Sequence, residues 1–263
     1  MNAAAAVTTT SPSMGRYVAH RPPQQEVPEG VTQSASGNLE QLCKALDLDA
    51  GAVRTLGDLA ATRIRLMKGQ TLFHVGDRFT SLYVIRAGSC KTVLLTEEGE
   101  EQVSGYYIAG DILGIDGLGE ERHGYRAIAL EDSELWAISF ERLRALACAD
   151  SAFQRTLHRA FAREIARVRG AVLMLGKMRA EQRLASFLLE IARRNHALGY
   201  SSTEFVLRMT RDEIGSYLGV TLETVSRLFS RFHQLGMIEV HGRTIKLLDL
   251  RALQRMLGLS VVN

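Results

Sequence analysis

The sequence is poor in cysteine and proline and has no long apolar run. Its three cysteines, Cys43, Cys90 and Cys148, are odd in number and far apart, which argues against a disulfide framework and fits a reducing cytoplasm. No apolar run approaches the roughly 18 residues of a membrane-spanning helix. The alanine-rich N-terminus has no basic flank of the kind that begins a signal peptide. These absences exclude a disulfide-stapled secreted domain and favour a cytoplasmic protein without a membrane anchor.

Signals for catalysis are missing as well. The seven histidines show no metal-ligand spacing, and the chain has neither a nucleophile elbow nor a phosphate-binding glycine loop. The net charge is only +3 and the isoelectric point is near 8.8, so binding to nucleic acid would have to depend on local clusters of charge. We therefore expect a protein that is not an enzyme and binds no metal. Its 263 residues suffice for two modest domains.

The N-terminal part of the chain divides into a tail and a β-rich domain. Residues 1–36 hold all four prolines amid Ala, Thr, Ser and Gln, which predicts a disordered tail, and Met14 is a second candidate start residue. Apolar residues at helical spacing between Leu39 and Leu59 predict one or two short helices. From Arg63 onward, short apolar runs alternate with glycine-containing turns, which favours an antiparallel roll or barrel.

The pattern returns to helical spacing between Phe153 and Gly176. An apolar stripe with alternating spacings of four and three is typical of a seam between two helices, while arginines cover the other sides. No charge interrupts this stripe, so we expect the chain to form a homodimer without any signal. The residues of the predicted seam are Leu157, Phe161, Ile165, Val168, Val172 and Leu175.

The stretch TRDEIGSYLGVTLETVSRLFSRFHQL, residues 210–235, predicts two helices joined by a tight turn. Thr210 and Glu213 form a capping-box pattern at the start of the first helix, and Gly219 permits the sharp reversal after it. In the second helix an apolar stripe faces the core; its members are Val225, Leu228 and Phe232. Two short strands follow around Gly242 and predict a wing.

The opposite face of the second helix is polar. Glu223, Ser226, Arg227, Ser230 and Arg231 combine acceptor, hydroxyl and bidentate donor groups suited to base edges and phosphates. The alternative is that Glu223 and Arg227 only form a surface ion pair, worth about 0.2–0.5 kcal/mol. The combination of cap, glycine turn, polar face and wing favours DNA binding.

These residues closely resemble the winged helix-turn-helix of the Crp/Fnr family of bacterial transcription regulators, and its Fnr branch in particular. The resemblance implies that a homodimer binds a TTGAT-like palindrome in double-stranded DNA. It further implies that Glu223 accepts from a base amino group, Ser226 contacts a thymine and Arg227 grips a guanine. For the DNA backbone we expect contacts from the remaining polar residues, Thr221, Thr224, Ser230 and Arg231.

The first half of the chain is similar to the cyclic-nucleotide-binding-type β-roll of the same family. The resemblance rests on three segments: residues 68–77 (KGQTLFHVGD), 82–88 (LYVIRAG) and 110–114 (GDILG). We therefore expect an α+β protein with a sensor roll, a long dimerisation helix and a C-terminal winged helix-turn-helix. The corresponding domains are a tail at 1–36, the roll with flanking helices at 37–150, the dimerisation helix at 151–178 and the DNA-binding domain at 179–263.

This chain lacks most of the residues that bind two known effectors of the family. In the Fnr branch four cysteines hold an iron–sulfur cluster; Cys43 stands at one of these positions, whereas Gly37, Ser34 and Trp136 stand at the others, and one thiolate is too few. Cyclic nucleotides are held by a Glu and an Arg-Ser pair. Ile115 stands at the Glu position, and residues 122–126 (RHGYR) contain no Arg-Ser pair. The sequence thus predicts neither an iron–sulfur cluster nor bound cAMP, and no cofactor.

Other features leave alternatives open. Cys148, between alanines, is expected to be a small buried residue, which leaves Cys43 and Cys90 as candidate redox thiols, with inert packed thiols as the alternative. The acidic turn with Glu97, Glu98, Glu100 and Glu101 is either a solvated hairpin or, as the resemblance implies, a surface that contacts RNA polymerase.

The leading hypothesis is thus a regulator, activator and/or repressor, that reads DNA sequence. The alternatives are a regulator that responds to a cyclic nucleotide or to thiol oxidation, and a sensory module whose DNA domain is vestigial.

Overall fold

Eight short strands form the first half of the described chain. The computed structural model describes residues 62–96 and 99–258, so the predicted tail, the predicted helices between Leu39 and Leu59, and Cys43 lie outside the described residues. The strands make two four-stranded sheets in which every pair is antiparallel. One sheet has the order β1 (Thr62–Leu66), β8 (Ser133–Ser139), β3 (Ser81–Ala87) and β6 (Ile112–Leu113). The other has the order β2 (Thr71–Phe73), β7 (Arg126–Ala129), β4 (Ser89–Leu95) and β5 (Glu101–Ile108).

The two sheets enclose an apolar interior, and glycine turns join their strands. The turn between β3 and β4 shows why glycine is needed. Gly88 has φ of +89°, and a Cβ atom there would lie 2.3 Å from Ser133 Oγ, so a side chain would be both strained and in collision. The predicted antiparallel β-roll is confirmed.

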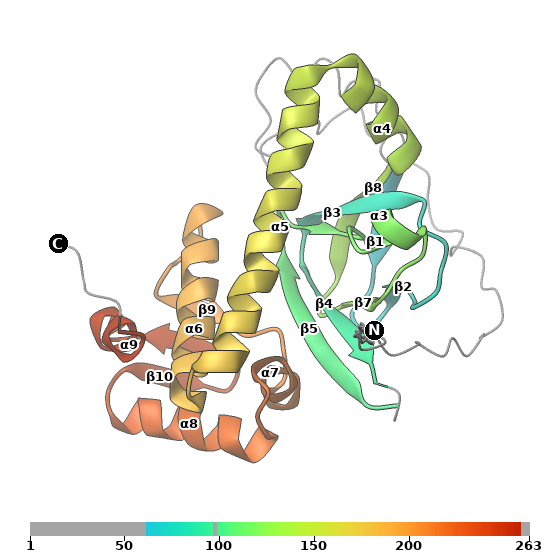
Figure 1. The fold of residues 1–263 in the computed structure, drawn as a ribbon. Helices are drawn as coiled ribbons and strands as arrows, with labels where there is room; N and C mark the ends of the chain where they lie inside the picture. Colours follow the sequence, from blue (N-terminus) through green and yellow to red (C-terminus); the bar gives the residue numbers. More distant parts are fainter. Residues whose placement is uncertain (1–61, 97–98, 259–263) are drawn as a thin grey trace, which may run out of the picture.

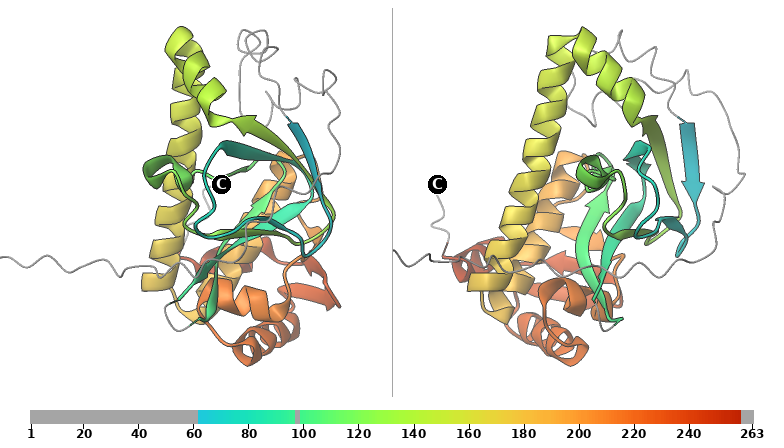
Figure 2. Two further views of the ribbon diagram at one scale, coloured as in Figure 1. Left: turned by 90° about the vertical axis from the view of Figure 1, so that its right-hand side faces the viewer. Right: turned by 45° about the vertical axis from the view of Figure 1, so that its right-hand side comes forward.

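The short α3 (Gly117–Glu120) lies between β6 and β7 of the roll. After β8, α4 (Phe140–Ala149) leads into α5 (Ser151–Lys177), as Figure 1 shows. With 27 residues α5 is about 40 Å long. It runs along one side of the roll and ends beside the C-terminal domain (Figure 2). Near its start Phe153 is buried in the cluster of apolar residues formed with the roll, and Leu157 and Phe161 pack against that cluster.

The C-terminal domain combines helices with a small sheet. Its elements are α6 (Ala180–Ala197), β9 (Glu204–Val206), α7 (Arg211–Leu218), α8 (Leu222–Gln234), β10 (Ile238–His241), β11 (Thr244–Leu247) and α9 (Leu250–Met256). The predicted wing strands β10 and β11 pair with each other, and β9 pairs with the far side of β11. The core of this domain continues into the roll through β5, because Val103, Tyr106 and Ile108 belong to the same apolar cluster.

None of the described helices combines the length and the apolar composition that a bilayer crossing requires.

Candidate nucleic-acid interface

The first helix of the pair, α7, begins with the predicted capping box. Thr210 Oγ1 accepts a hydrogen bond from Glu213 N at 3.1 Å, and Glu213 Oε2 accepts one from Thr210 N at 2.6 Å. The helix ends at Gly219, whose φ of +64° is left-handed. Gly215 was not singled out in the sequence, yet a Cβ atom there would lie 2.7 Å from Val220 O. Two glycines therefore allow α7 and the turn to pack closely enough to set the angle of α8.

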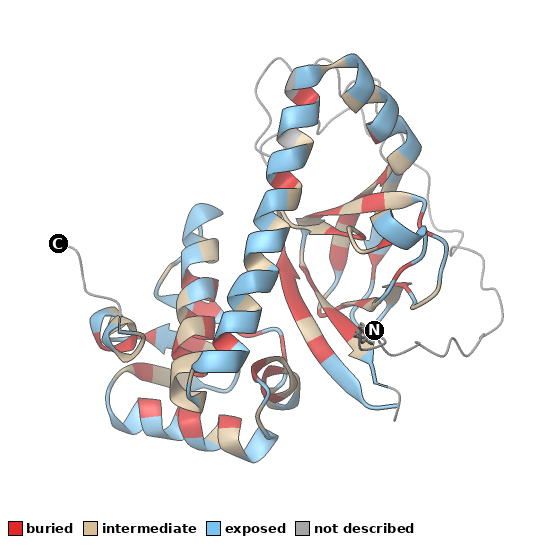
Figure 3. Cartoon of the chain, in the orientation of Figure 1, coloured by how far each residue is buried: buried red, intermediate tan, exposed pale blue. Residues whose placement is uncertain are grey.

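The second helix, α8, has one buried side. Val225, Leu228 and Phe232 are buried as predicted, and Phe229 is buried beside them. Arg211, at the start of α7, lies 3.4 Å above the Phe229 ring, and burial lowers the pKa of this guanidinium. The packing fixes the rotation of α8, so the opposite side must face solvent (Figure 3).

The exposed side of α8 carries the predicted base-reading residues. Glu223 and Arg227 are exposed, and Ser226 is half-buried. Hydrogen bonds from its own backbone N–H and from the Thr221 hydroxyl lower the pKa of Glu223. Arg227 Nη2 lies 3.3 Å from Thr224 Oγ1 and donates to that hydroxyl.

The residues predicted to contact the DNA backbone line the same side. Thr221 Oγ1 accepts from Thr224 N at 3.3 Å and so caps α8. Ser230 Oγ donates to Ser226 O at 3.1 Å. Arg231 Nη1 lies 2.9 Å from Glu181 Oε1 on α6, and its side chain is 62% exposed. Arg231 would have to exchange this carboxylate for a phosphate on DNA.

No local pattern in the sequence predicts the contacts that join α7 to the roll. Lys91 Nζ on β4 donates to Glu213 Oε1 at 2.6 Å. Val103 N, at the free edge of β5, donates to Ser216 Oγ at 2.8 Å, and the Gln102 side-chain amide donates to Ser216 O. The roll thus holds the helix that positions α8.

Arg183 on α6 is a second junction residue that sequence reasoning missed. Its guanidinium donates to Leu175 O at 2.7 Å and Met178 O at 3.0 Å, at the end of α5, and to Leu218 O at 2.8 Å, at the end of α7. The carbonyls of Leu175 and Leu218 lie in the last turns of their helices, where helix C-termini leave such groups without a partner inside the helix. One side chain therefore satisfies the ends of two helices and fixes the corner between them.

The predicted dimer seam falls into two parts. Leu157 and Phe161 are half-buried against the roll. Ile165, Val168 and Val172 are 53%, 51% and 66% exposed, and the last seam residue, Leu175, is exposed as well. The second part is an apolar strip that the described part of a single chain leaves uncovered.

The acidic turn between β4 and β5 is described only in part, because Glu97 and Glu98 lie outside the described residues. Glu100 is exposed, and its backbone N–H donates to Thr96 Oγ1 at 3.1 Å. Glu101 pairs with Arg126 on β7. A polymerase contact at this turn stays a prediction.

The structure reverses the expected ranking of two cysteines. Cys90 is completely buried, and burial raises the pKa of its thiol to about 12, which is the opposite of what a reactive thiol needs. Cys148, expected to be buried, is exposed. Cys90 points into the roll because both faces of β4 are covered, whereas Cys148 lies near the outer end of α4.

The interior of the roll does not fit a cyclic phosphate. Asp116 accepts from Gly124 N at 2.6 Å and faces His123 Nδ1 at 3.4 Å. The His123 ring stacks on Phe73 with centroids 3.6 Å apart. Arg122 Nη1 donates to Gly76 O at 2.7 Å. Aromatic rings and a carboxylate therefore fill the region where an anion would need donors.

The roll position at which the Fnr branch has a cluster-binding cysteine does not fit an iron–sulfur cluster either. Trp136 is buried among apolar side chains there, and an indole ring cannot replace a thiolate.

Taken together, the geometry defines a winged helix-turn-helix DNA-binding protein whose reading helix is exposed and whose first helix is attached to a β-roll. Residues 182–256 match the Crp-like helix-turn-helix domain, and residues 63–150 match the cyclic nucleotide-binding domain.

Several known proteins are similar over most of the chain. The transcriptional regulatory protein btr of Bordetella pertussis is 42% identical over 237 residues, which cover 89% of this chain and 98% of that protein. The fumarate and nitrate reduction regulatory protein of Escherichia coli is 39% identical over 221 residues, covering 84% and 88%. The solved structure of FixK2 from Bradyrhizobium japonicum has a TM-score of 0.71 at 28% identity and covers 77% of this chain and 100% of that one. The chain belongs to the Crp/Fnr family of transcription regulators.

Proposed function

We propose that the protein binds a TTGAT-like inverted repeat as a homodimer and regulates transcription from it as an activator and/or repressor. The observation that carries this proposal is the exposed polar side of α8. Glu223 supplies a carboxylate for a base amino group, Ser226 a hydroxyl for a thymine, and Arg227 a bidentate donor for guanine O6 and N7. The buried stripe behind them holds these groups on a rigid helix.

Backbone contacts would position α8 in the major groove. Thr221, Thr224, Ser230 and Arg231 flank the base-reading set, and hydroxyl and guanidinium groups are the usual partners of phosphate oxygens. These contacts carry no sequence information. A vestigial DNA domain would have no reason to keep three base-reading groups together on one exposed side, which favours the regulator over a purely sensory module.

The second half of α5 supports the homodimer. The uncovered strip from Ile165 to Leu175 has the spacing of a two-helix seam, and pairing it with a second copy would remove its apolar side chains from water. A two-fold axis along this seam would place two α8 helices in successive major grooves about 34 Å apart.

Signal input is expected to involve neither an iron–sulfur cluster nor cAMP. The support comes from Trp136 at the expected ligand position and from the filled roll interior around His123. Buried Cys90 speaks against thiol oxidation at that residue. We further propose that the acidic turn with Glu100 and Glu101 contacts RNA polymerase, and that the protein works in the cytoplasm and catalyses no reaction.

Selection from random duplex DNA tests the proposal. After several rounds of binding and amplification, the retained sequences should share two inverted TTGAT-like half-sites whose centres are one helical turn, about 10 bp, or a multiple of it apart. Lengthening the spacer by about half a turn should abolish tight binding. A lone half-site would contradict the homodimer, and retained sequences without any shared motif would contradict base reading.

A further inference from the structure

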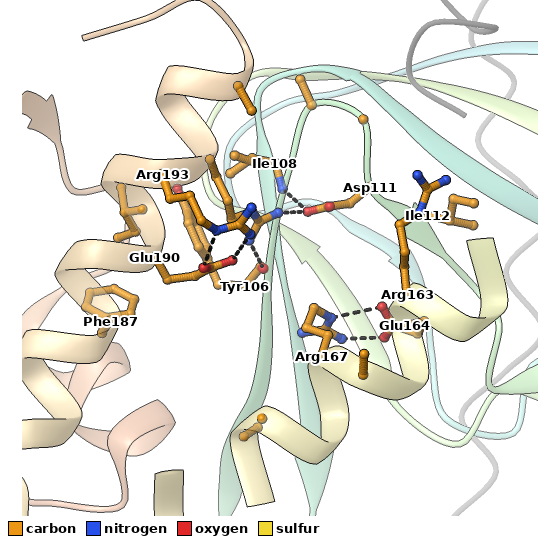
Figure 4. A pocket seen from close by; sticks show the side chains of 18 of the residues that line it. Tyr106, Ile108, Asp111, Ile112, Arg163, Glu164, Arg167, Phe187, Glu190 and Arg193 are labelled. Carbon is orange, nitrogen blue, oxygen red and sulfur yellow. Dashed lines mark hydrogen bonds and ion pairs between the residues drawn. The ribbon is translucent and has the colours of Figure 1, made fainter. Parts of the chain in front are cut away.

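A cavity of 690 Å³ lies between the roll, α5 and α6. Figure 4 shows that its walls come from both domains: Asp111 from the roll, Arg163 and Arg167 from α5, and Glu190 and Arg193 from α6. The first helix of the DNA-binding pair also contributes, through Tyr217. The volume of the cavity lies within the usual range of ligand sites, which often occur where domains meet.

The charged groups in the cavity are four guanidiniums and three carboxylates. Arg167 Nε donates to Glu164 Oε2 at 2.9 Å, and Arg193 Nη2 donates to Glu190 Oε1 at 2.7 Å. Arg194 pairs with Asp111 and also donates to Tyr106 O at 3.1 Å. Arg163 lines the cavity as well, so arginines from two helices, α5 and α6, contribute to its wall.

These ion pairs are suited to exchange. Arg193 and Glu190 are 69% and 49% exposed in their side chains, and such exposed pairs contribute little to stability. An anion that reaches the cavity could take the place of Glu190 on Arg193 at small cost. Guanidinium groups bind phosphates and carboxylates in bidentate fashion.

The rest of the cavity is apolar. Ile108, Ile112, Met174 and Ile191 line it, together with the aromatic ring of Phe187. An inorganic ion would leave these side chains without a partner. An organic molecule would cover them with its body and direct its anionic groups to the arginines.

We propose that this cavity binds a small organic polyanion, a metabolite with two or more phosphate or carboxylate groups on an apolar or aromatic body. Arg163 and Arg193 are its first anchors, since both are exposed at the cavity and lie on different helices. The occupant touches the roll, α5, α6 and α7 at once, so it favours the arrangement in which the roll holds the helix-turn-helix.

The consequence for DNA rests on the proposed function. If the occupied arrangement differs from the empty one in DNA affinity, ligand and DNA must change each other's affinity by the same factor. Binding of the ligand itself requires no DNA. Ligand binding in the cavity and the proposed DNA binding can therefore fail separately.

Calorimetric titration of the full chain without DNA tests the site. Three probes separate the chemistries: inorganic pyrophosphate has phosphates only, citrate has carboxylates only, and guanosine diphosphate has two phosphates with an aromatic base. We expect at least one of them to bind with a Kd below about 1 mM. The variant R163Q/R193Q should weaken that binding at least tenfold, because it removes one anchor from each helix.

The matched control is R169Q/R251Q, which removes the same charge at exposed residues outside the cavity. It should bind the probe like the wild type. Equal weakening by both variants would show general charge attraction and overturn the site, as would the absence of saturable binding for all three probes. Far-ultraviolet circular dichroism confirms that both variants keep the fold.

Discussion

Lys91 Nζ and Glu213 Oε1 lie 2.6 Å apart and connect strand β4 of the roll to helix α7 of the DNA-binding pair. The same carboxylate accepts the backbone N–H of Thr210 and thereby caps α7. Both side chains are mostly buried, at 14% and 20% exposure, so water competes weakly for the pair. One acidic residue therefore starts the helix and attaches it to the sensor domain.

Removing the lysine should destabilise the protein. In Lys91→Met, Glu213 keeps its cap but loses its charged partner, and we expect a loss of about 1–3 kcal/mol in the free energy of unfolding. Urea unfolding followed by circular dichroism measures it, with Lys177→Met at the exposed end of α5 as control. A double-mutant cycle with Glu213→Gln isolates the coupling, and a coupling of zero would show that the pair contributes nothing.

The contribution of this pair should depend on pH. Burial of Glu213 raises its pKa, but the hydrogen bonds from Lys91 and Thr210 outweigh burial and leave the pKa lowered. A lowered folded pKa stabilises the protein fully above the unfolded pKa, and this stabilisation is lost as the pH falls through the folded value. The difference in stability between wild type and Lys91→Met should therefore be constant near pH 7 and shrink below about pH 4.5. A difference that grows on acidification would contradict the assignment.

Sequence reasoning succeeded where the interactions are local. The capping box joins Thr210 and Glu213, three residues apart, and the buried stripe of α8 follows from helical spacing alone. The contact of Lys91 with Glu213 spans 122 positions, and no local pattern carries it. The glycine turns indicated the roll, yet they did not show that aromatic rings fill its interior.

The cysteines also show that sequence reasoning misses what distant parts of the chain determine. Cys90 lies next to Lys91, which made it the better redox candidate than Cys148, but strand β4 is central in its sheet and covered on both faces. Burial depends on the neighbours that the fold brings to a strand, and these come from elsewhere in the chain. The expectation for Cys148 failed because its alanine neighbours are compatible with either side of a helix.

Thiol labelling tests this correction. With the folded protein at pH 8, iodoacetamide should modify Cys148 and spare Cys90, whose pKa of about 12 leaves almost no thiolate and whose burial blocks access. Mass spectrometry of tryptic peptides locates the modification. Adding denaturant should expose both thiols equally, and rapid labelling of Cys90 in the folded chain would contradict the structure.

Charge within the strip on α5 should prevent dimerisation. Val172→Glu would bury a carboxylate at the seam without a partner, which costs several kcal/mol per copy. We expect a monomer in sedimentation equilibrium and loss of tight binding to a two-half-site DNA. Val172→Met keeps the position apolar and should remain dimeric. A dimeric Val172→Glu protein would show that the seam lies elsewhere.

Protein purified without air should contain no iron–sulfur cluster. Trp136 occupies the roll position expected for a cluster ligand and is buried there, and an indole ring offers no thiolate. Iron analysis and the absorption spectrum of this protein show whether it contains a cluster. A brown, iron-bearing sample would overturn this prediction while leaving DNA reading untouched.

The most direct test of DNA reading compares Arg227→Ala with Arg231→Ala in gel shifts on a TTGAT-like palindrome and on a scrambled duplex, at one salt concentration. Arg227→Ala should cost about 1–3 kcal/mol on the palindrome and little on the scrambled duplex, whereas Arg231→Ala should weaken both alike. Equal losses on both duplexes for Arg227→Ala would contradict base reading by α8.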